Sequence, residues 1–139
     1  MHNIYIDGSC LGNGQPGAVG GWGFVIYDNN HCKTHEDLGK LPGEEKQTNN
    51  RAELYALIQA LQWVKKHPEI KACIKSDSKI VIDGLKGSAI RKANRDLWAP
   101  IESLCKELNG RITAEHVYRD KNKEADALAR QGANALITL

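Results

Sequence analysis

The feature that most constrains the fold of this chain is the order of its predicted strands and helices. Three strand-like runs precede any helical pattern, at residues 3–7, 20–27 and 33–40. Helices and strands then alternate, with helices at 50–66, 78–85, 95–108 and 123–134 and strands at 72–76 and 112–118. This order is typical of an α/β domain built on a mixed sheet.

The long helix predicted at residues 50–66 decides how the strands are arranged. Its apolar residues recur at helical spacing, and the pair His67 and Pro68 ends the pattern. The helix connects the first group of strands to the strand at 72–76. Because such crossovers are right-handed, this strand is expected to lie parallel to the first one and beside it. The strand ends at Ile6 and Ser76 should then lie at the same edge of the sheet.

Size and composition predict one soluble domain that covers residues 1–139. The N-terminus shows no secretory leader pattern, and no apolar run approaches the roughly 18 residues of a membrane span. The four cysteines lack C-x-x-C spacing and are expected to be free thiols. We therefore expect a cytoplasmic protein with no membrane contact and no obligate protein partner, which acts as a monomer.

Residues 12–17 match the G-x-G-x-x-G pattern of dinucleotide-binding proteins and follow a predicted strand. In that motif a helix begins at the glycines, and its N-terminus receives the pyrophosphate. Residues 18–27 are instead rich in glycine, β-branched and aromatic residues, which favours a second strand. The glycines are therefore interpreted as a hairpin turn that also allows another molecule's backbone to approach closely.

Four acidic residues are predicted to gather at one edge of the sheet. Asp7 follows the first strand, Asp77 follows the fourth, and Glu53 and Asp126 lie in the first turns of two helices. Ligand sites of open α/β sheets lie outside the carboxyl ends of the strands. Each acid also has a local alternative: an Asx-turn for Asp7, an N-cap for Asp77, a capping box with Asn50 for Glu53, and a position that complements the helix dipole for Asp126.

The local alternatives do not explain why four acids should meet at one edge. Carboxylates that lie close together repel and need positive charge nearby. A divalent cation supplies that charge, and all-oxygen ligands suit a hard ion such as Mg²⁺. Two such ions stabilise the attacking and leaving oxygens of a phosphoryl displacement. The acids therefore predict a metal-dependent site.

The segments IDGSCLGNG, QTNNRAEL, IKSDS and NKEADALAR occur in the order and approximate spacing of type 1 ribonuclease H, which the chain resembles over nearly its whole length. The resemblance implies a ribonuclease H-like α/β fold with a mixed five-stranded sheet flanked by helices. It implies endonucleolytic hydrolysis of the RNA strand of RNA/DNA hybrids, with two Mg²⁺ ions or with Mn²⁺ as a substitute. The catalytic and metal-binding acids of the family correspond to Asp7, Glu53, Asp77 and Asp126.

The same resemblance implies contacts to the substrate. Contacts to RNA 2′-hydroxyls and backbone correspond to Cys10, Asn13, Asn49 and Asn50, and the DNA-phosphate pocket corresponds to Asn13 and Thr48. Lys79 stands where many relatives carry a glutamine that contacts RNA. Asparagine amides suit this task because the 2′-hydroxyl both donates and accepts hydrogen bonds. The turn at 12–17 is therefore expected to lie against the minor groove of a hybrid.

One departure from the family lies before the third helix. Many bacterial members carry a long basic protrusion with extra tryptophan, whereas this chain has only residues 86–95, with four cations, no acid and no tryptophan. The segment is either a phosphate-contacting patch or a solvated loop. Substrate binding is expected to be modest and sensitive to salt.

A second departure lies between the fifth strand and the last helix. Many relatives have a loop with a histidine there, but residues 119–122 contain none. Arg119 is a candidate catalytic residue that holds a scissile or leaving phosphate, and the alternative is a solvated cation paired with Asp120. His116 falls within the predicted fifth strand and is expected to be a structural residue that faces the sheet.

Two other functions remain open from the sequence. The first is a DNA junction resolvase or exonuclease, because fold and metal-binding acids are shared among such activities. The pair Asn49 and Asn50 disfavours it. The second is a noncatalytic module that binds RNA/DNA hybrids, which the four intact acids disfavour.

Overall fold

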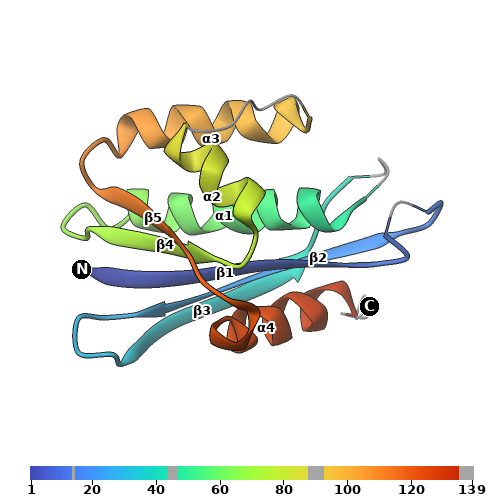
Figure 1. Ribbon diagram of the computed structural model, residues 1–139, viewed down its shortest axis with the longest axis horizontal. Coiled ribbons are helices and arrows are strands. Elements are labelled where there is room, and N and C mark those ends of the chain that lie inside the picture. The colour runs from blue at the N-terminus through green and yellow to red at the C-terminus, as the bar shows by residue number, and fades with distance from the viewer. Residues whose placement is uncertain (14, 44–46, 88–92, 135–139) are drawn as a thin grey trace.

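The structure is a computed structural model that describes residues 1–13, 15–43, 47–87 and 93–134. A five-stranded sheet in the order β3-β2-β1-β4-β5 forms its centre (Figure 1). The strands are β1 (His2–Leu11), β2 (Val19–Tyr27), β3 (Lys33–Lys40), β4 (Ala72–Ser76) and β5 (Ile112–His116). The helices are α1 (Asn49–Lys65), α2 (Lys79–Lys86), α3 (Arg95–Glu107) and α4 (Lys123–Ala133), with a 3-10 helix, η1 (Arg119–Lys121), before α4. The predicted mixed sheet with flanking helices is confirmed.

Strands β1 and β2 form the predicted hairpin and pair in antiparallel fashion up to Leu11 and Val19. Gly12 and Gly17 have φ angles of +69° and +78°. Glycine adopts this left-handed conformation without the steric cost that a side chain brings. The described residues of the turn form no helix, so the dinucleotide-binding interpretation is excluded.

Strand β1 is longer than predicted. It continues to Leu11 because its antiparallel pairing with β2 extends past Asp7 to the hairpin turn. The prediction that Asp7 follows the strand is therefore wrong, since Asp7 lies within it. The parallel pairing of β1 with β4 is confirmed and ends at Tyr5 opposite Lys75. Asp7 and Asp77 each lie two residues beyond this last pair, so both reach the same edge where the two strands separate.

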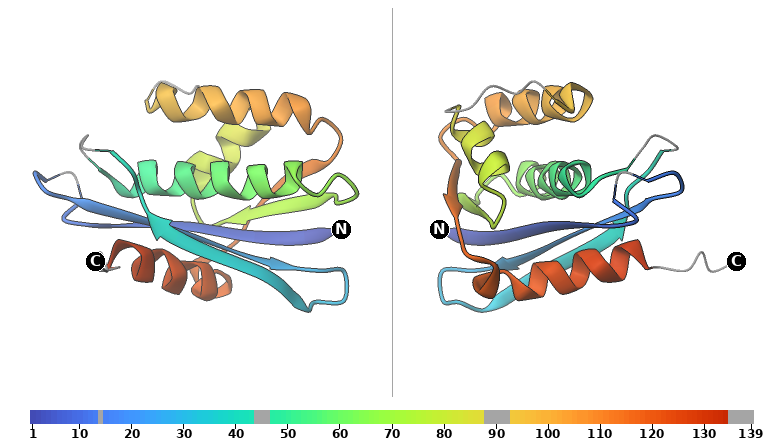
Figure 2. Two further views of the ribbon diagram at one scale, coloured as in Figure 1. Left: turned by 180° about the vertical axis from the view of Figure 1, so that it is seen from behind. Right: turned by 45° about the vertical axis from the view of Figure 1, so that its right-hand side comes forward.

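The helices form layers on the two faces of the sheet. Helix α1 packs on one face with α3 outside it, and α4 packs on the opposite face (Figures 1 and 2). The main core lies between the sheet and α1. The predicted apolar stripe of α1 is buried there: Leu54, Leu57, Ile58, Leu61 and Val64.

Glycines in β2 allow α4 to lie directly on the sheet. A methyl group added at Gly21 would come within 2.1 Å of the backbone nitrogen of Ala133. At Gly23 the distance to the backbone nitrogen of Ala129 would be 2.8 Å. Both distances are too short for any side chain. This close contact fixes α4, and with it Asp126, against the strand that pairs with β1.

Two predictions from composition can be compared with the structure. All four cysteines are free thiols, as expected. Within the described part of the chain, no helix is both long and apolar enough to cross a membrane. The basic segment 86–95 falls partly outside the described residues, since 88–92 are not described.

Candidate active site

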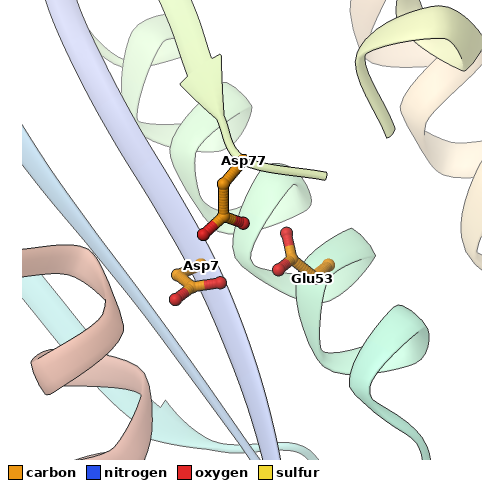
Figure 3. A group of neighbouring side chains, drawn as sticks. All are labelled: Asp7, Glu53 and Asp77. Atoms are coloured by element: carbon orange, nitrogen blue, oxygen red, sulfur yellow. The ribbon is translucent and has the colours of Figure 1, made fainter. Parts of the chain in front are cut away.

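Three of the four predicted acids form a close group. Asp7 lies on β1, Glu53 on α1, and Asp77 directly after β4 (Figure 3). One carboxylate oxygen from each lies within 4.8 Å of the others. In Figure 3 the three side chains point toward a common centre. The sheet edge predicted from the sequence therefore does bring these acids together.

Gly8 allows Glu53 to reach this position. A methyl group built on Gly8 would lie 2.2 Å from the backbone nitrogen of Glu53 and 2.4 Å from the carbonyl carbon of Ala52. Only glycine leaves room for α1 to touch β1 here. The buried hydroxyl of Ser76 then donates a hydrogen bond of 3.3 Å to Glu53 Oε2. Backbone contact and this hydrogen bond together hold Glu53 beside Asp7.

The local alternatives for the acids are largely removed by the structure. The N-cap of α1 is Thr48, whose hydroxyl accepts from the backbone nitrogen of Arg51, so Asn50 and Glu53 form no capping box. Glu53 also lies beyond the first turn of α1, contrary to the prediction. The N-cap of α2 is Ser78 and not Asp77. Helix capping therefore accounts for neither Glu53 nor Asp77.

Asp7 retains one local interaction. Its Oδ1 accepts a hydrogen bond of 2.9 Å from the backbone nitrogen of Gly8. This bond joins neighbouring residues within a strand, whereas the predicted Asx-turn required Asp7 to follow the strand. Asp7 is only 5 % exposed. A buried carboxylate with one backbone donor needs further compensation for the loss of water.

Burial and mutual repulsion change the protonation of the group. Burial raises the pKa of Asp7 from its ordinary 3.8 to about 6, and the charge of Asp77 contributes to the rise. Burial also raises the pKa of Glu53 well above its ordinary value, and Asp7 adds to this. The hydrogen bond between the two carboxyls lowers the pKa of Asp7 and raises that of Glu53. The two carboxyl groups therefore both bind protons more tightly than they would in water.

The ligand atoms fit a hard divalent cation. The close group offers carboxylate oxygens alone, and among the described residues no lysine or arginine forms an ion pair with any of its three members. Carboxylates are the protein ligands that Mg²⁺ and similar ions prefer. A cation at this point would offset the repulsion that raises the pKa values of Asp7 and Glu53.

Asp126 lies beside the close group. It occupies the first turn of α4, is half-buried, and contributes to the raised pKa of Asp7 through an interaction of the two side chains. Arg130 Nε donates to its Oδ1 at 3.3 Å. The fourth predicted acid thus lies at the outer side of the site, where it is partly neutralised by its own helix.

The predicted substrate contacts lie on two neighbouring segments. Asn13 Oδ1 accepts a hydrogen bond of 2.7 Å from the backbone nitrogen of Asn49, which joins the hairpin turn to the start of α1. Thr48 precedes this helix, and the side chains of Asn49 and Asn50 are exposed in its first turn. Cys10 is half-buried near the end of β1.

The remaining candidates follow the ends of β4 and β5. Lys79 is the exposed first residue of α2, two residues after Asp77. Arg119 is the exposed first residue of η1. Among the described residues its guanidinium forms no ion pair, so the predicted alternative of a pair with Asp120 is not seen.

His116 differs from its prediction. It was expected to face the sheet as a structural residue, but it is exposed at the end of β5. Its Nε2 lies 3.3 Å from the carbonyl oxygen of Asp77. The strand ends here, so a side chain at this position can turn toward solvent and toward the residue that follows β4. His116 therefore borders the acidic group.

Sequence reasoning missed Asn122, which connects α4 to β1. Its Nδ2 donates a hydrogen bond of 2.9 Å to the carbonyl oxygen of Ile6, next to Asp7. An asparagine directly before a helix would usually be interpreted as an N-cap. Here the side chain makes no capping bond and is buried against the strand. The only sequence signal was its place four residues before Asp126.

The fold and the site can now be compared with known proteins. The sequence matches the model of the RNase H family over residues 1–134. A ribonuclease H of Hyphomonas neptunium is 36% identical, with 96% of this chain and 93% of the relative covered. A ribonuclease H of Parvibaculum lavamentivorans is 35% identical, with 93% of this chain and 89% of the relative covered. The chain belongs to the ribonuclease H family.

Solved structures give the same result for the fold. LC11-RNase H1 in complex with an RNA/DNA hybrid superposes with a TM-score of 0.82 at 26% identity, over 96% of this chain and 97% of that one. RNase H1 of the archaeon Halobacterium salinarum superposes with a TM-score of 0.76 at 29% identity, over 94% of this chain and 96% of that one. The predicted ribonuclease H-like fold is confirmed.

Proposed function

We propose that this chain is an endonuclease that hydrolyses the RNA strand of RNA/DNA hybrids with two divalent cations. The observation that carries the proposal is the close group of Asp7, Glu53 and Asp77 in a member of the ribonuclease H family. Support for the substrate comes from LC11-RNase H1, a similar structure that is in complex with an RNA/DNA hybrid. Mg²⁺ is the proposed cation, and Mn²⁺ is a possible substitute.

The four acids are proposed to hold the cations. Asp7, Glu53 and Asp77 offer oxygens to a shared centre, and Asp126 offers its carboxylate from the outer side. The chemistry supplied by bound divalent cations is stabilisation of the attacking and leaving oxygens in a displacement at phosphorus. Water is the proposed nucleophile, and the products carry 5′-phosphate and 3′-hydroxyl ends, as the family implies.

The choice of RNA over DNA is assigned to the start of α1 and the hairpin turn. Asn49 and Asn50 present exposed side-chain amides, which can donate to and accept from a 2′-hydroxyl. Asn13 and Thr48 are proposed to contact a phosphate of the DNA strand. Cys10 completes the RNA contacts beside the turn. Because Asn13 is tied to the backbone of Asn49, the two sets of contacts keep a fixed spacing.

Lys79 and Arg119 are proposed to contact the backbone of the substrate. Both are exposed cations at the start of short helices, and each follows a strand that ends at this edge. Lys79 is assigned to the RNA backbone. Arg119 is assigned to the scissile or leaving phosphate, which a planar guanidinium can hold through two hydrogen bonds.

The protein is further proposed to act as a monomer in the cytoplasm. Its four free cysteines are consistent with a reducing compartment. Size-exclusion chromatography with light scattering tests the oligomeric state, and a dimer at working concentration would contradict it. Fractionation of the source cells tests the compartment.

The function is tested with a matched set of substrates of one sequence: RNA/DNA hybrid, double-stranded RNA, double-stranded DNA and single-stranded RNA. We expect Mg²⁺-dependent internal cleavage of RNA in the hybrid and no cleavage of the DNA duplex. Equal cleavage of the DNA duplex would instead support a resolvase or exonuclease. Hybrid binding without turnover at any Mg²⁺ or Mn²⁺ concentration would support a noncatalytic module.

A further inference from the structure

One large apolar side chain at the edge of the site has no role in the function proposed above. Tyr118 is 77 % exposed, more than any other large hydrophobic residue in the described part of the chain. It directly precedes Arg119 and leaves β5 at the edge where the acids gather. A tyrosine ring in water forgoes the free energy that burial would give. A binding partner that covers the ring would recover it.

The backbone around Tyr118 is fixed on both sides. The nitrogen of Val117 donates a hydrogen bond of 2.9 Å to the carbonyl oxygen of Ser76, the residue that precedes Asp77. The carbonyl oxygen of Tyr118 accepts a hydrogen bond of 2.9 Å from the nitrogen of Lys121 in η1. The ring is therefore presented from a backbone that is joined to the end of β4, directly before Asp77.

The ring itself packs against His116. The two ring centres are 5.6 Å apart, and the ring planes meet at 84°, the edge-to-face arrangement that aromatic pairs favour. His116 also lies 3.3 Å from the carbonyl oxygen of Asp77. Tyr118 is thus connected through one side chain to the backbone of a candidate metal ligand.

The chemistry of a paired hybrid limits what this ring can cover. Paired bases stack on one another, so the apolar surface that a hybrid offers from its groove and backbone is the sugar. Contacts to sugar and phosphate position a protein on a nucleic acid, independent of sequence. A tyrosine ring can pack on a sugar, and its hydroxyl can bond to a 2′-hydroxyl or a phosphate oxygen. The neighbouring Arg119 favours a phosphate next to that sugar.

We propose that Tyr118 positions the substrate by packing its ring against a ribose of the RNA strand beside the cleaved phosphate. This inference rests on the proposed function and adds one contact to it. The contact is made to a sugar that does not react, so it is equally strong in the bound substrate and in the transition state. Loss of such a contact raises KM and leaves kcat unchanged.

The test compares Tyr118→Ala, Tyr118→Phe and the parent in steady-state cleavage of a short hybrid. We expect Tyr118→Ala to raise KM about tenfold with kcat within about twofold, on the scale of aromatic contacts to nucleotides. Tyr118→Phe keeps the ring and should retain most of the affinity. Asp120→Ala is the matched control, because it removes an exposed side chain two residues after Tyr118 and keeps the ring. It should not raise KM.

Hybrid affinity measured by fluorescence anisotropy in Ca²⁺ separates this inference from the proposed function. If the parent binds hybrid but does not cleave it, the proposed function fails, and the affinity ratio of parent to Tyr118→Ala still decides the role of the ring. Equal hybrid affinities of parent and Tyr118→Ala would overturn the inference. A fall in kcat with KM unaltered would also overturn it. A parent that neither binds nor cleaves hybrid would overturn both. Unchanged thermal unfolding of Tyr118→Ala excludes a structural cause.

Discussion

The two halves of the acidic site are built in different ways. Asp7 and Glu53 are 5 % and 6 % exposed and lie on elements whose backbones touch at Gly8. Asp126 and Arg119 lie at the start of α4 and η1, where Asp126 is half-buried and Arg119 is exposed. The inner half is therefore buried in the core, whereas the outer half lies nearer to solvent, on the first turn of α4 and on the short helix η1.

This difference has an energetic consequence. The inner half places carboxyl groups together in a region poor in water, and their raised pKa values report the cost. The outer half carries no comparable cost, because Asp126 is close to Arg130 and the side chain of Arg119 remains in solvent. Changes to the inner half should therefore affect activity strongly and make stability depend on pH, and changes to the outer half should affect activity modestly.

The largest effect is expected for Asp77→Asn. The change keeps the shape of the side chain but removes a charge from the group of three. We expect kcat to fall by about a thousandfold or more, since several kcal/mol of charge stabilisation would depend on the cations that the group is proposed to hold. Hybrid affinity in Ca²⁺ and thermal unfolding should remain close to those of the parent.

The matched control for Asp77→Asn is Asp83→Asn, which removes one acidic charge from the nearby helix α2 outside the group. It should retain activity within about threefold, as expected for an acid that is not part of the group of three. Substantial Mg²⁺-dependent turnover by Asp77→Asn would reject Asp77 as an essential ligand. The inner half would then depend on Asp7 and Glu53 alone.

The inner half was also the part of the site that the sequence predicted best. Parallel strands that end at one edge made the meeting of Asp7 and Asp77 foreseeable from connectivity alone. What the sequence could not show was the length of β1, because the end of a strand depends on its pairing with β2 and not on its own residues. The role of Gly8 was hidden for a similar reason, since close packing against α1 leaves no local pattern.

The outer half was predicted less well, because it depends on contacts between distant residues. The bond from Asn122 to Ile6 joins residues that are 116 positions apart. The exposure of His116 was missed because alternation within a strand says nothing about the residue at which the strand ends. The role of Arg119 follows from the family resemblance and from its place in the chain, and it stays a prediction.

The second prediction concerns how the free energy of unfolding of the metal-free protein depends on pH. Asp7 has an ordinary pKa of 3.8 and a pKa of about 6 in the folded state. The folded state thus binds the proton more tightly, and the stability that this provides is present below about pH 4 and is lost as pH rises through 6. From pH 5 to pH 8 we expect the free energy of unfolding to fall by about 1 kcal/mol from this residue. Glu53 changes it in the same direction.

Thermal unfolding of the parent and of Asp7→Asn is measured in EDTA at pH 5 and at pH 8. The difference between the two declines in stability gives the contribution of Asp7. The variant cannot lose a proton at this position, so it should show a smaller decline and should be more stable than the parent at pH 8. Added Mg²⁺ should reduce the decline of the parent. An identical pH dependence of parent and variant would show that the pKa of Asp7 is not raised in the folded protein.

The smallest effect is expected in the outer half, for Arg119→Ala. We expect kcat to fall by at least about tenfold, a loss of roughly 1.4 kcal/mol of transition-state stabilisation. Stability should not change, because the side chain is exposed and forms no ion pair among the described residues. Lys121→Ala removes a neighbouring cation from the same short helix and controls for the overall charge.

Arg119→Lys separates charge from geometry in the same measurement. A lysine keeps the positive charge but cannot form the paired hydrogen bonds of a guanidinium, so an intermediate kcat would assign part of the effect to the planar group. Because arginine stays protonated at ordinary pH, the residue cannot serve as a general base, and its loss should leave the shape of the pH–rate profile unchanged. If Arg119→Ala cleaves hybrid at the parent rate, the phosphate is held without this side chain, and the outer half contributes only through Asp126.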